Sequence, residues 1–301
     1  MVMVRNLDGR ARFRLTGPDR VRFLHGLVTN DIKALGPGQG CRAAMLTVKG
    51  KTLCELAIYA DEEALDLELD GELREKIRAT LEKHMMMDDV ELIDRTDETR
   101  ELGVYGDGAR AAIERALSSP LPPLLPYHHV TVGGVRVAAA PELAVDGYHL
   151  VGELGGITIE GDAIDDARWE ILRVEAGRPR SGVDVDEDRL ILEAGMEDAV
   201  SLTKGCYLGQ EVVARATARG HINRKLVGLT LGGEGEASRG ARLSGAGRDE
   251  AGLITSSVVS PRFGPIALGY VHRSLWEPGT TLTVHDPKGE RIAAVVALPF
   301  R

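Results

Sequence analysis

The stretch Lys204-Gly205-Cys206-Tyr207-Leu208-Gly209-Gln210-Glu211 is the most distinctive in the chain and the strongest guide to its fold. Its two glycines allow the backbone to turn sharply and to approach a ligand. A nearby ammonium stabilises a thiolate, so Cys206 could be a nucleophile, a redox group or a ligand of a metal or cluster. From these residues alone, a cysteine that merely packs in a turn is an equally good interpretation.

The composition is that of a globular chain of 301 residues, long enough for two or three domains. The formal net charge of -9 argues against non-specific binding to nucleic acid, which needs a basic face. Three cysteines without a Cys-x-x-Cys pair do not form a disulfide framework. No secretory signal opens the sequence, and no apolar run approaches the roughly 20 residues of a membrane helix. We expect a cytoplasmic protein that binds neither nucleic acid directly nor membranes.

Hydrophobic periodicity predicts mixed helices and strands over the first part of the chain and strands alone after it. From residue 222 onward, short strand-like runs separated by glycine- or proline-containing turns indicate a small barrel or sandwich. Before that point, the pattern favours helices near 18–28, 71–86, 109–117 and 163–176, with strands at 45–48, 52–59, 64–69, 101–105, 130–140 and 147–153.

The hairpin over residues 45–59 divides its side chains between two faces. Strand alternation puts Cys54, Leu56 and Ile58 on one face and Glu55 on the other, so Cys54 should be a small buried hydrophobe. In the helix that follows, the adjacent Met85-Met86-Met87 is expected to fill the core.

Glu175 lies near the end of the helix predicted at 163–176. A carboxylate there could accept two parallel N–H bonds from a planar heterocycle such as a pterin or guanine edge. A solvated glutamate at a helix end is the more common arrangement. Asn30 and Asp31 are likewise more often turn formers than ligand-binding residues. Nothing supplies the further ligands of a zinc site beside His128-His129, so we expect no metal site.

Several segments together resemble one family. Residues 23–31 (Phe-Leu-His-Gly-Leu-Val-Thr-Asn-Asp), 173–177 continuing to 182–184, and the ending at 252–271 are similar to motifs of the glycine-cleavage T-protein superfamily. The stretch 204–211 resembles the segment that marks its YgfZ branch. Dinucleotide-binding, P-loop and nucleophile-elbow motifs are absent from the sequence.

The resemblance implies an α+β, three-domain T-protein-like fold, with two interleaved ferredoxin-like domains and a C-terminal small β-barrel. The folate-binding domain would comprise residues 1–48 and 155–221. The inserted ferredoxin-like domain would comprise 49–154, and the barrel would comprise 222–301.

The resemblance also implies a function. The protein would bind tetrahydrofolate, or a polyglutamylated or one-carbon derivative of it, and would support the assembly or repair of iron–sulfur proteins, which would be its partners. Arg215, Arg219 and Arg224 could attract a polyglutamate tail. By the resemblance, the catalytic candidates are Cys206, Lys204 and Glu55, and the folate-binding candidates are Glu175, Arg173, Asn30, Asp31, Tyr207 and Gln210.

One departure from the T-protein pattern bears on the activity. T-proteins carry an aspartate pair in the strand after the first hairpin turn, and its second member is the catalytic acid/base. The matching residues here are Cys54 and Glu55. A shift of about 1 Å in a reacting group can cost on the order of 100-fold in rate, so this change disfavours ordinary aminomethyl transfer. A folate-dependent aminomethyltransferase or demethylase stays as one alternative, and a non-catalytic folate-fold scaffold as another.

Overall fold

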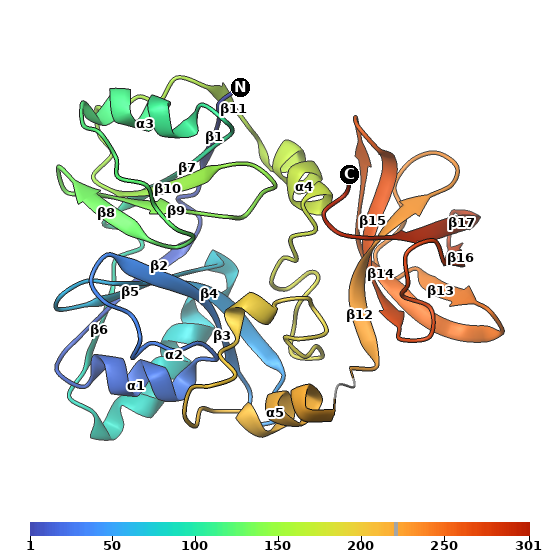
Figure 1. Ribbon diagram of the computed structural model, residues 1–301, viewed down its shortest axis with the longest axis horizontal. Helices are drawn as coiled ribbons and strands as arrows, with labels where there is room; N and C mark the ends of the chain where they lie inside the picture. The colour runs from blue at the N-terminus through green and yellow to red at the C-terminus, as the bar shows by residue number, and fades with distance from the viewer. Residues whose placement is uncertain (220–221) are drawn as a thin grey trace. The chain divides into compact units, whose positions relative to one another are not determined.

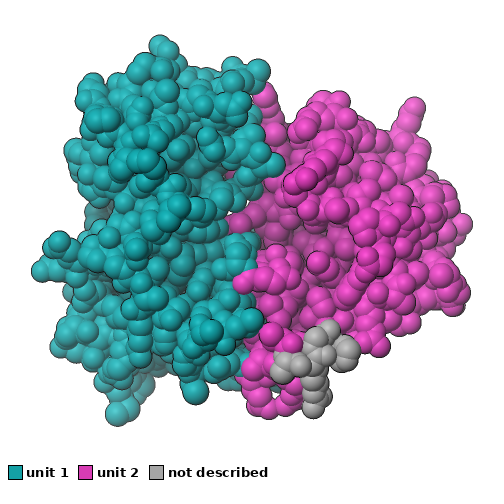
Figure 2. Space-filling model, in the orientation of Figure 1, with its two compact units in different colours: residues 1–164, 198–210 teal, residues 165–197, 211–301 magenta. Residues whose placement is uncertain are grey.

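A computed structural model describes residues 1–219 and 222–301, which form two compact units (Figures 1 and 2). Unit 1 comprises Met1–Ile164 and Asp198–Gln210, and unit 2 comprises Asp165–Glu197 and Glu211–Arg301. The chain therefore leaves unit 1 after residue 164, returns for a short segment, and leaves again after residue 210. Each unit has its own hydrophobic core.

The first sheet of unit 1 is five-stranded and antiparallel. Its strands lie in the order β3 (Gln39–Leu46), β4 (Thr52–Ala60), β5 (Leu65–Leu69), β2 (Ala11–Thr16) and β6 (Glu91–Asp94). Helices α1 (Arg20–Leu27) and α2 (Arg74–His84) cover one face, with the short turns η1 (Gly71–Leu73) and η2 (Met85–Met87) at the ends of α2.

The side-chain pattern of β4 confirms the predicted division of its two faces. Cys54, Leu56 and Ile58 are at most 1% exposed and belong to the core beneath α1 and α2. Glu55 lies on the opposite face of the strand, as alternation requires.

β3 pairs with β4 from Gln39 opposite Ala60 to Leu46 opposite Thr52, and the domain boundary predicted at residue 48 lies within this hairpin. The prediction that Met85-Met86-Met87 fills the core is wrong for two of the three residues. Met85 continues the buried stripe of α2, whereas Met86 and Met87 are 89% and 93% exposed.

The second sheet of unit 1 is six-stranded and is covered on one face by α3 (Ala109–Leu117) (Figure 1). Its other face meets the first sheet through Tyr59, Tyr127 and Ala138, so unit 1 has four layers. The strands lie in the order β11 (Asp162–Ala163), β1 (Met3–Asn6), β7 (Arg100–Tyr105), β10 (Gly147–Gly152), β9 (Val135–Ala139) and β8 (His129–Val132).

Unit 2 is built around a closed six-stranded barrel, and the strand-like runs expected after residue 222 match its strands except β13 (Arg242–Gly245). Hydrogen bonding runs in the order β12 (Arg224–Leu231), β15 (Gly264–His272), β14 (Arg248–Ser260), β13 (Arg242–Gly245), β16 (Thr281–Asp286) and β17 (Gly289–Val296). The remaining regular elements of the described residues are α4 (Asp166–Glu175), η3 (Glu197–Ala199) and α5 (Gln210–Arg219).

Helix α4 packs on the barrel through Ile171 and Val174, which join a cluster with residues of β14 and β15. It begins at Asp165, whose carboxylate accepts the N–H of Arg168 at 2.8 Å. It ends before Gly177, which has φ +71°, and a Cβ at this position would lie 2.8 Å from the Cβ of Leu298. Glycine is therefore required both by the left-handed turn and by the barrel side chain beside it.

None of the helices in the described ranges is long and apolar enough to span a membrane.

Candidate functional site

The ammonium group of Lys204 is buried against the end of α1. Its Nζ donates to the carbonyl oxygens of His25 and Val28, both at 2.6 Å, and of Asn30 at 2.8 Å. Burial lowers the pKa of Lys204 from 10.5 to about 8, and the opposing charge of Asp31 only partly offsets this effect. Because helix ends leave carbonyl groups without partners, the lysine satisfies acceptors that α1 cannot satisfy itself.

Further hydrogen bonds hold the segment 199–209 along α1 and the hairpin after it. Ser201 N donates to Thr29 O, and Leu208 N donates to Gly26 O, both at 3.0 Å. Gly209 has φ +80°, and a Cβ there would lie 2.6 Å from the carbonyl oxygen of Thr47. Gly209, one of the two glycines expected to let the backbone approach a ligand, is therefore needed for close packing within unit 1.

Cys206 is exposed, in contrast to Lys204 and Tyr207, which are buried. Tyr207 is buried, with its ring centroid 4.9 Å from Lys204 Nζ, and its N–H donates to Gln210 Oε1 at 3.4 Å. Lys204, Tyr207 and Gln210 thus hold the turn, and the thiol is the group that the turn presents to solvent. The geometry favours a positioning role for Lys204, because its ammonium is bound to main-chain oxygens.

Glu55 belongs to a charged cluster in the same unit. Arg42, on the neighbouring strand β3, donates from Nε to Glu55 Oε1 at 2.7 Å and from Nη1 to Asp198 Oδ1 at 2.9 Å. Asn30 Nδ2 donates to Arg42 O at 2.7 Å and to Asp198 O at 3.2 Å. This network fixes a carboxylate beside a guanidinium. Arg42 and Asp198 lie 156 positions apart, so no local sequence pattern pointed to either residue.

Asp31 shapes the turn that follows α1. Its Oδ1 accepts the N–H groups of Lys33 at 3.1 Å and Ala34 at 3.3 Å. Its own N–H donates to Asn30 Oδ1 at 2.9 Å. These bonds are those of a turn-forming aspartate. Asn30 connects Lys204 to the charged cluster of Glu55. Its carbonyl oxygen accepts a hydrogen bond from Lys204, and its side-chain amide donates to the carbonyl oxygen of Arg42.

The other two cysteines, Cys41 and Cys54, have thiols of low reactivity. Burial raises the pKa values of Cys41 and Cys54 to about 12, so both remain thiols at neutral pH. For Cys54 this agrees with the core position predicted from strand alternation.

Glu175, in unit 2, is buried at the end of α4. Its side chain is 8% exposed. Oε1 accepts a hydrogen bond from Ser260 Oγ at 2.6 Å, and Oε2 lies 3.3 Å from Arg262 Nη1. Ser260 is the last residue of β14, and Arg262 lies in the turn that leads to β15. Glu175 is therefore not a solvated glutamate at a helix end. Ser260 lies 85 positions away in the chain, so no local pattern pointed to this partner.

Arg173, predicted to bind folate, lies in the interior of unit 2 and is 1% exposed. Its Nη1 donates to Asp184 Oδ2 at 2.7 Å, its Nη2 to Ser256 Oγ at 2.7 Å, and its Nε to Glu170 Oε2 at 2.8 Å. All three guanidinium nitrogens therefore have partners in the protein. This geometry favours a structural role, in which Arg173 ties α4 to the barrel. The side chain of Arg219, suggested to attract polyglutamate, is outside the described residues.

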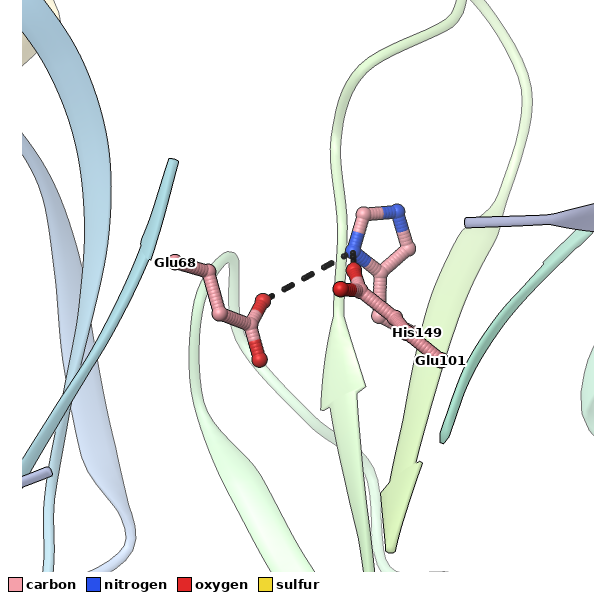
Figure 3. A group of neighbouring side chains, drawn as sticks. All are labelled: Glu68, Glu101 and His149. Atoms are coloured by element: carbon pink, nitrogen blue, oxygen red, sulfur yellow. Dashed lines mark ion pairs between the residues drawn. The ribbon is translucent and has the colours of Figure 1, made fainter. Parts of the chain in front are cut away.

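A second cluster of titratable groups, not singled out by the sequence, lies between the two sheets of unit 1 (Figure 3). His149 Nδ1 is 3.1 Å from Glu101 Oε1 and 3.9 Å from Glu68 Oε2, and all three side chains are buried. Burial opposes protonation of His149, but Tyr105, Glu142 and Glu101 raise its pKa well above the usual value. A protonated His149 pairs with the carboxylates around it.

This cluster has ligand types suited to a metal, but its surroundings oppose a cation. Arg12 Nη1 lies 3.2 Å from Glu101 Oε2, Arg10 Nε lies 3.6 Å from Glu101 Oε1, and Arg136 is bonded to Glu68. Three guanidinium groups already neutralise the carboxylates, so a divalent ion would meet strong repulsion. We therefore interpret the cluster as an ion-pair network that joins the two sheets.

Comparison with known sequences identifies two matching family models. Residues 2–155 match the GCVT N-terminal domain, and residues 224–300 match the glycine cleavage T-protein C-terminal barrel domain. An aminomethyltransferase of Rubrobacter xylanophilus is 33% identical over 307 residues, which cover 97% of this chain and 80% of that protein. An aminomethyltransferase of Thermotoga petrophila is 29% identical over 312 residues, covering 96% and 83%.

Comparison with solved structures shows the same fold. The glycine cleavage system aminomethyltransferase T from Bartonella henselae superposes with a TM-score of 0.90 at 22% identity, covering 100% of this chain and 86% of the other. The predicted α+β T-protein-like fold with a C-terminal barrel is thereby confirmed. The chain belongs to the glycine cleavage T-protein family.

Proposed function

We propose that this protein binds a tetrahydrofolate derivative and acts on the one-carbon unit that the folate carries. The observation that carries the proposal is the buried carboxylate of Glu175. One of its oxygens accepts a hydrogen bond from Ser260, and the other pairs with the exposed Arg262. A carboxylate in such a setting can accept paired N–H bonds from a pterin edge. Bound tetrahydrofolate would supply the nitrogen atoms that accept or release the one-carbon unit.

Titration calorimetry with tetrahydrofolate under reducing conditions tests the binding step. Wild-type protein should release or absorb heat at a single class of sites, and Glu175→Gln should bind at least about 10-fold more weakly, because it loses a charge-assisted acceptor. Glu234→Gln, an exposed position of the same unit, serves as the matched control. The absence of heat with wild type would favour a scaffold that keeps only the fold.

The activity best supported is transfer of an aminomethyl or N-methyl carbon to tetrahydrofolate. Relatives of this chain are named aminomethyltransferases, and Glu55 occupies the position that the T-protein resemblance gives to the acid/base. Arg42 holds its carboxylate at 2.7 Å, so Glu55 offers a fixed negative charge beside a reacting amine.

An assay for methylene-tetrahydrofolate with aminomethyl and N-methyl donors tests this activity. Glu55→Gln should keep tetrahydrofolate affinity but lower the rate by about 100-fold or more, because a charge aimed at the reacting centre is lost. Product formation by the glutamine variant at the wild-type rate would remove Glu55 from the mechanism. A lack of product from every plausible donor would remove the activity itself.

The exposure of Cys206 favours a second candidate, the iron–sulfur role of the YgfZ branch. The thiol lies at the surface of a segment whose neighbouring residues are anchored, as a reactive or ligating group would require. In a strain lacking the gene, Cys206→Ala should fail to restore iron–sulfur enzyme activity while Glu55→Gln succeeds. The opposite pattern would support one-carbon transfer, so this pair of variants separates the two candidates.

A further inference from the structure

The two oxygens of the Glu175 carboxylate have different surroundings. Oε1 accepts a hydrogen bond from Ser260 Oγ at 2.6 Å, and the same hydroxyl oxygen accepts the N–H groups of Arg262 and Phe263, each at 3.0 Å. Three bonds thus converge on one serine at the end of β14. They fix Oε1 in place and leave little room for a ligand to replace Ser260.

Oε2 has a partner that can leave. Arg262 Nη1 lies 3.3 Å from it, and the Arg262 side chain is 69% exposed. The guanidinium carbon lies 4.7 Å from the ring centroid of Phe263, so the planar cation rests on an aromatic ring at the surface. Because the arginine of this pair is exposed, water and salt screen its attraction to the buried carboxylate.

A guanidinium and a pterin edge offer a carboxylate the same thing, a planar array of N–H donors. We propose that Arg262 is an internal competitor for Oε2 of Glu175, and that ligand binding exchanges the arginine for the N–H edge of the heterocycle. The inference rests on the proposed folate-binding function of Glu175. It makes Arg262 a residue that sets affinity by competition, and Ser260 the residue that positions the carboxylate.

The test uses 6-methyltetrahydropterin, which has the heterocycle but lacks the carboxylates of the folate tail. Arg262 therefore cannot add affinity by attracting a tail. In calorimetric titrations of the full chain, Arg262→Gln should bind this probe about 2- to 5-fold more tightly than wild type, the range expected for release of an exposed ion pair. Arg239→Gln changes an exposed arginine of the same unit that contacts only main-chain oxygens, and it should bind like wild type.

A double-mutant cycle shows whether the gain acts through Glu175. In a Glu175→Gln background, Arg262→Gln should change probe affinity by less than about 1.5-fold, because the attraction that it removes is already absent. Raising the salt from 0.05 to about 0.5 M should narrow the difference between wild type and Arg262→Gln, because salt screens the competing pair. A role of Arg262 in structure alone would predict neither result.

Equal or weaker binding of the probe by Arg262→Gln would overturn the inference, as would failure of this variant to bind the probe at all. A wild-type protein that bound neither tetrahydrofolate nor the probe would instead refute the proposed function. Binding of tetrahydrofolate by wild type, with no gain in Arg262→Gln, would leave the function standing and refute the competition. Thermal unfolding of each variant confirms that the protein tested is folded.

Discussion

The segment around Lys204 in unit 1 and the end of α4 in unit 2 share one arrangement. In each, a buried cation precedes the candidate functional residue by two positions: Lys204 precedes Cys206, and Arg173 precedes Glu175. The segments differ in what neutralises the cation. Lys204 is bound to three main-chain carbonyl oxygens, whereas Arg173 is bound to the carboxylates of Glu170 and Asp184.

Because their partners differ, the two buried cations should respond differently to pH. Carbonyl dipoles only partly replace the hydration of an ammonium, and burial brings the pKa of Lys204 down to about 8. A guanidinium does not lose its proton in proteins, and full charges oppose it at Asp184 and Glu170. The anchor of Cys206 should therefore respond to pH, whereas the anchor of Glu175 should not.

The largest effect is expected from Arg173→Met. The change leaves Asp184 as an uncompensated charge inside unit 2, which typically costs about 3–5 kcal/mol. Both tryptophans of the chain, Trp169 and Trp276, lie in unit 2, so urea unfolding followed by their fluorescence reports on this unit. Arg239→Met is the exposed control and should cost less than about 0.5 kcal/mol. A loss of stability below about 1 kcal/mol for Arg173→Met would show that Arg173 does not anchor the end of α4.

Gly209→Ala should weaken unit 1 by about 2–3 kcal/mol, because alanine is strained at φ +80° and its Cβ would lie 2.6 Å from Thr47 O. Hydrogen exchange of residues 45–52 and 204–209 should become faster. Gly205→Ala is a matched control, since no heavy atom lies within 4 Å of a Cβ at that position. Similar exchange in both variants would show that the packing at Gly209 is unimportant.

Lys204→Met should cost about 2 kcal/mol at neutral pH, because carbonyl oxygens at the end of α1 lose their donor. The pH dependence gives the sharper test. Below pH 8 the lysine is protonated in both folded and unfolded protein. Between about pH 8 and 10.5 the unfolded chain binds more protons, so wild type should gain stability relative to Lys204→Met as the pH rises. A flat difference would show that the buried ammonium keeps its ordinary pKa.

The smallest effect is expected from Cys206→Ser, which should change stability by less than about 0.5 kcal/mol, since the side chain is exposed. Alkylation of the native protein should modify wild type at Cys206 first, because burial raises the pKa values of the half-buried Cys41 and the buried Cys54 to about 12. Rapid labelling of the serine variant would contradict this assignment.

Local patterns predicted helices α1 to α4 and most strands, but they missed β2 and α5. Alternation correctly placed Cys54 in the core, and the strand spacing after residue 222 predicted the barrel. The core assignment of Met86 and Met87 was wrong because the apolar stripe of α2 recurs every four residues and ends at Met85. The boundary predicted at residue 48 lies within the hairpin of β3 and β4, because strand pattern alone does not say which strands share a sheet.

The candidate site was predicted only in part, for a related reason. Sequence pointed to Glu175 and Lys204, but their partners are distant in the chain. Ser260 lies 85 positions from Glu175, and the carbonyl groups that bind Lys204 lie 174 to 179 positions away. Main-chain acceptors carry no signature in a sequence, so the positioning role of Lys204 could be found only in the structure.

The passage of the chain between its two units has a consequence for synthesis. Arg173 and Glu175 emerge from the ribosome before the barrel strand that carries Ser256 and Ser260. At roughly 5–20 residues per second, the 85 residues between Glu175 and Ser260 take about 4–17 seconds to make. During that interval α4 has no barrel to pack against, and its charges remain in water. A ribosome-stalled chain should acquire a protease-resistant α4 only once β14 and β15 have cleared the exit tunnel.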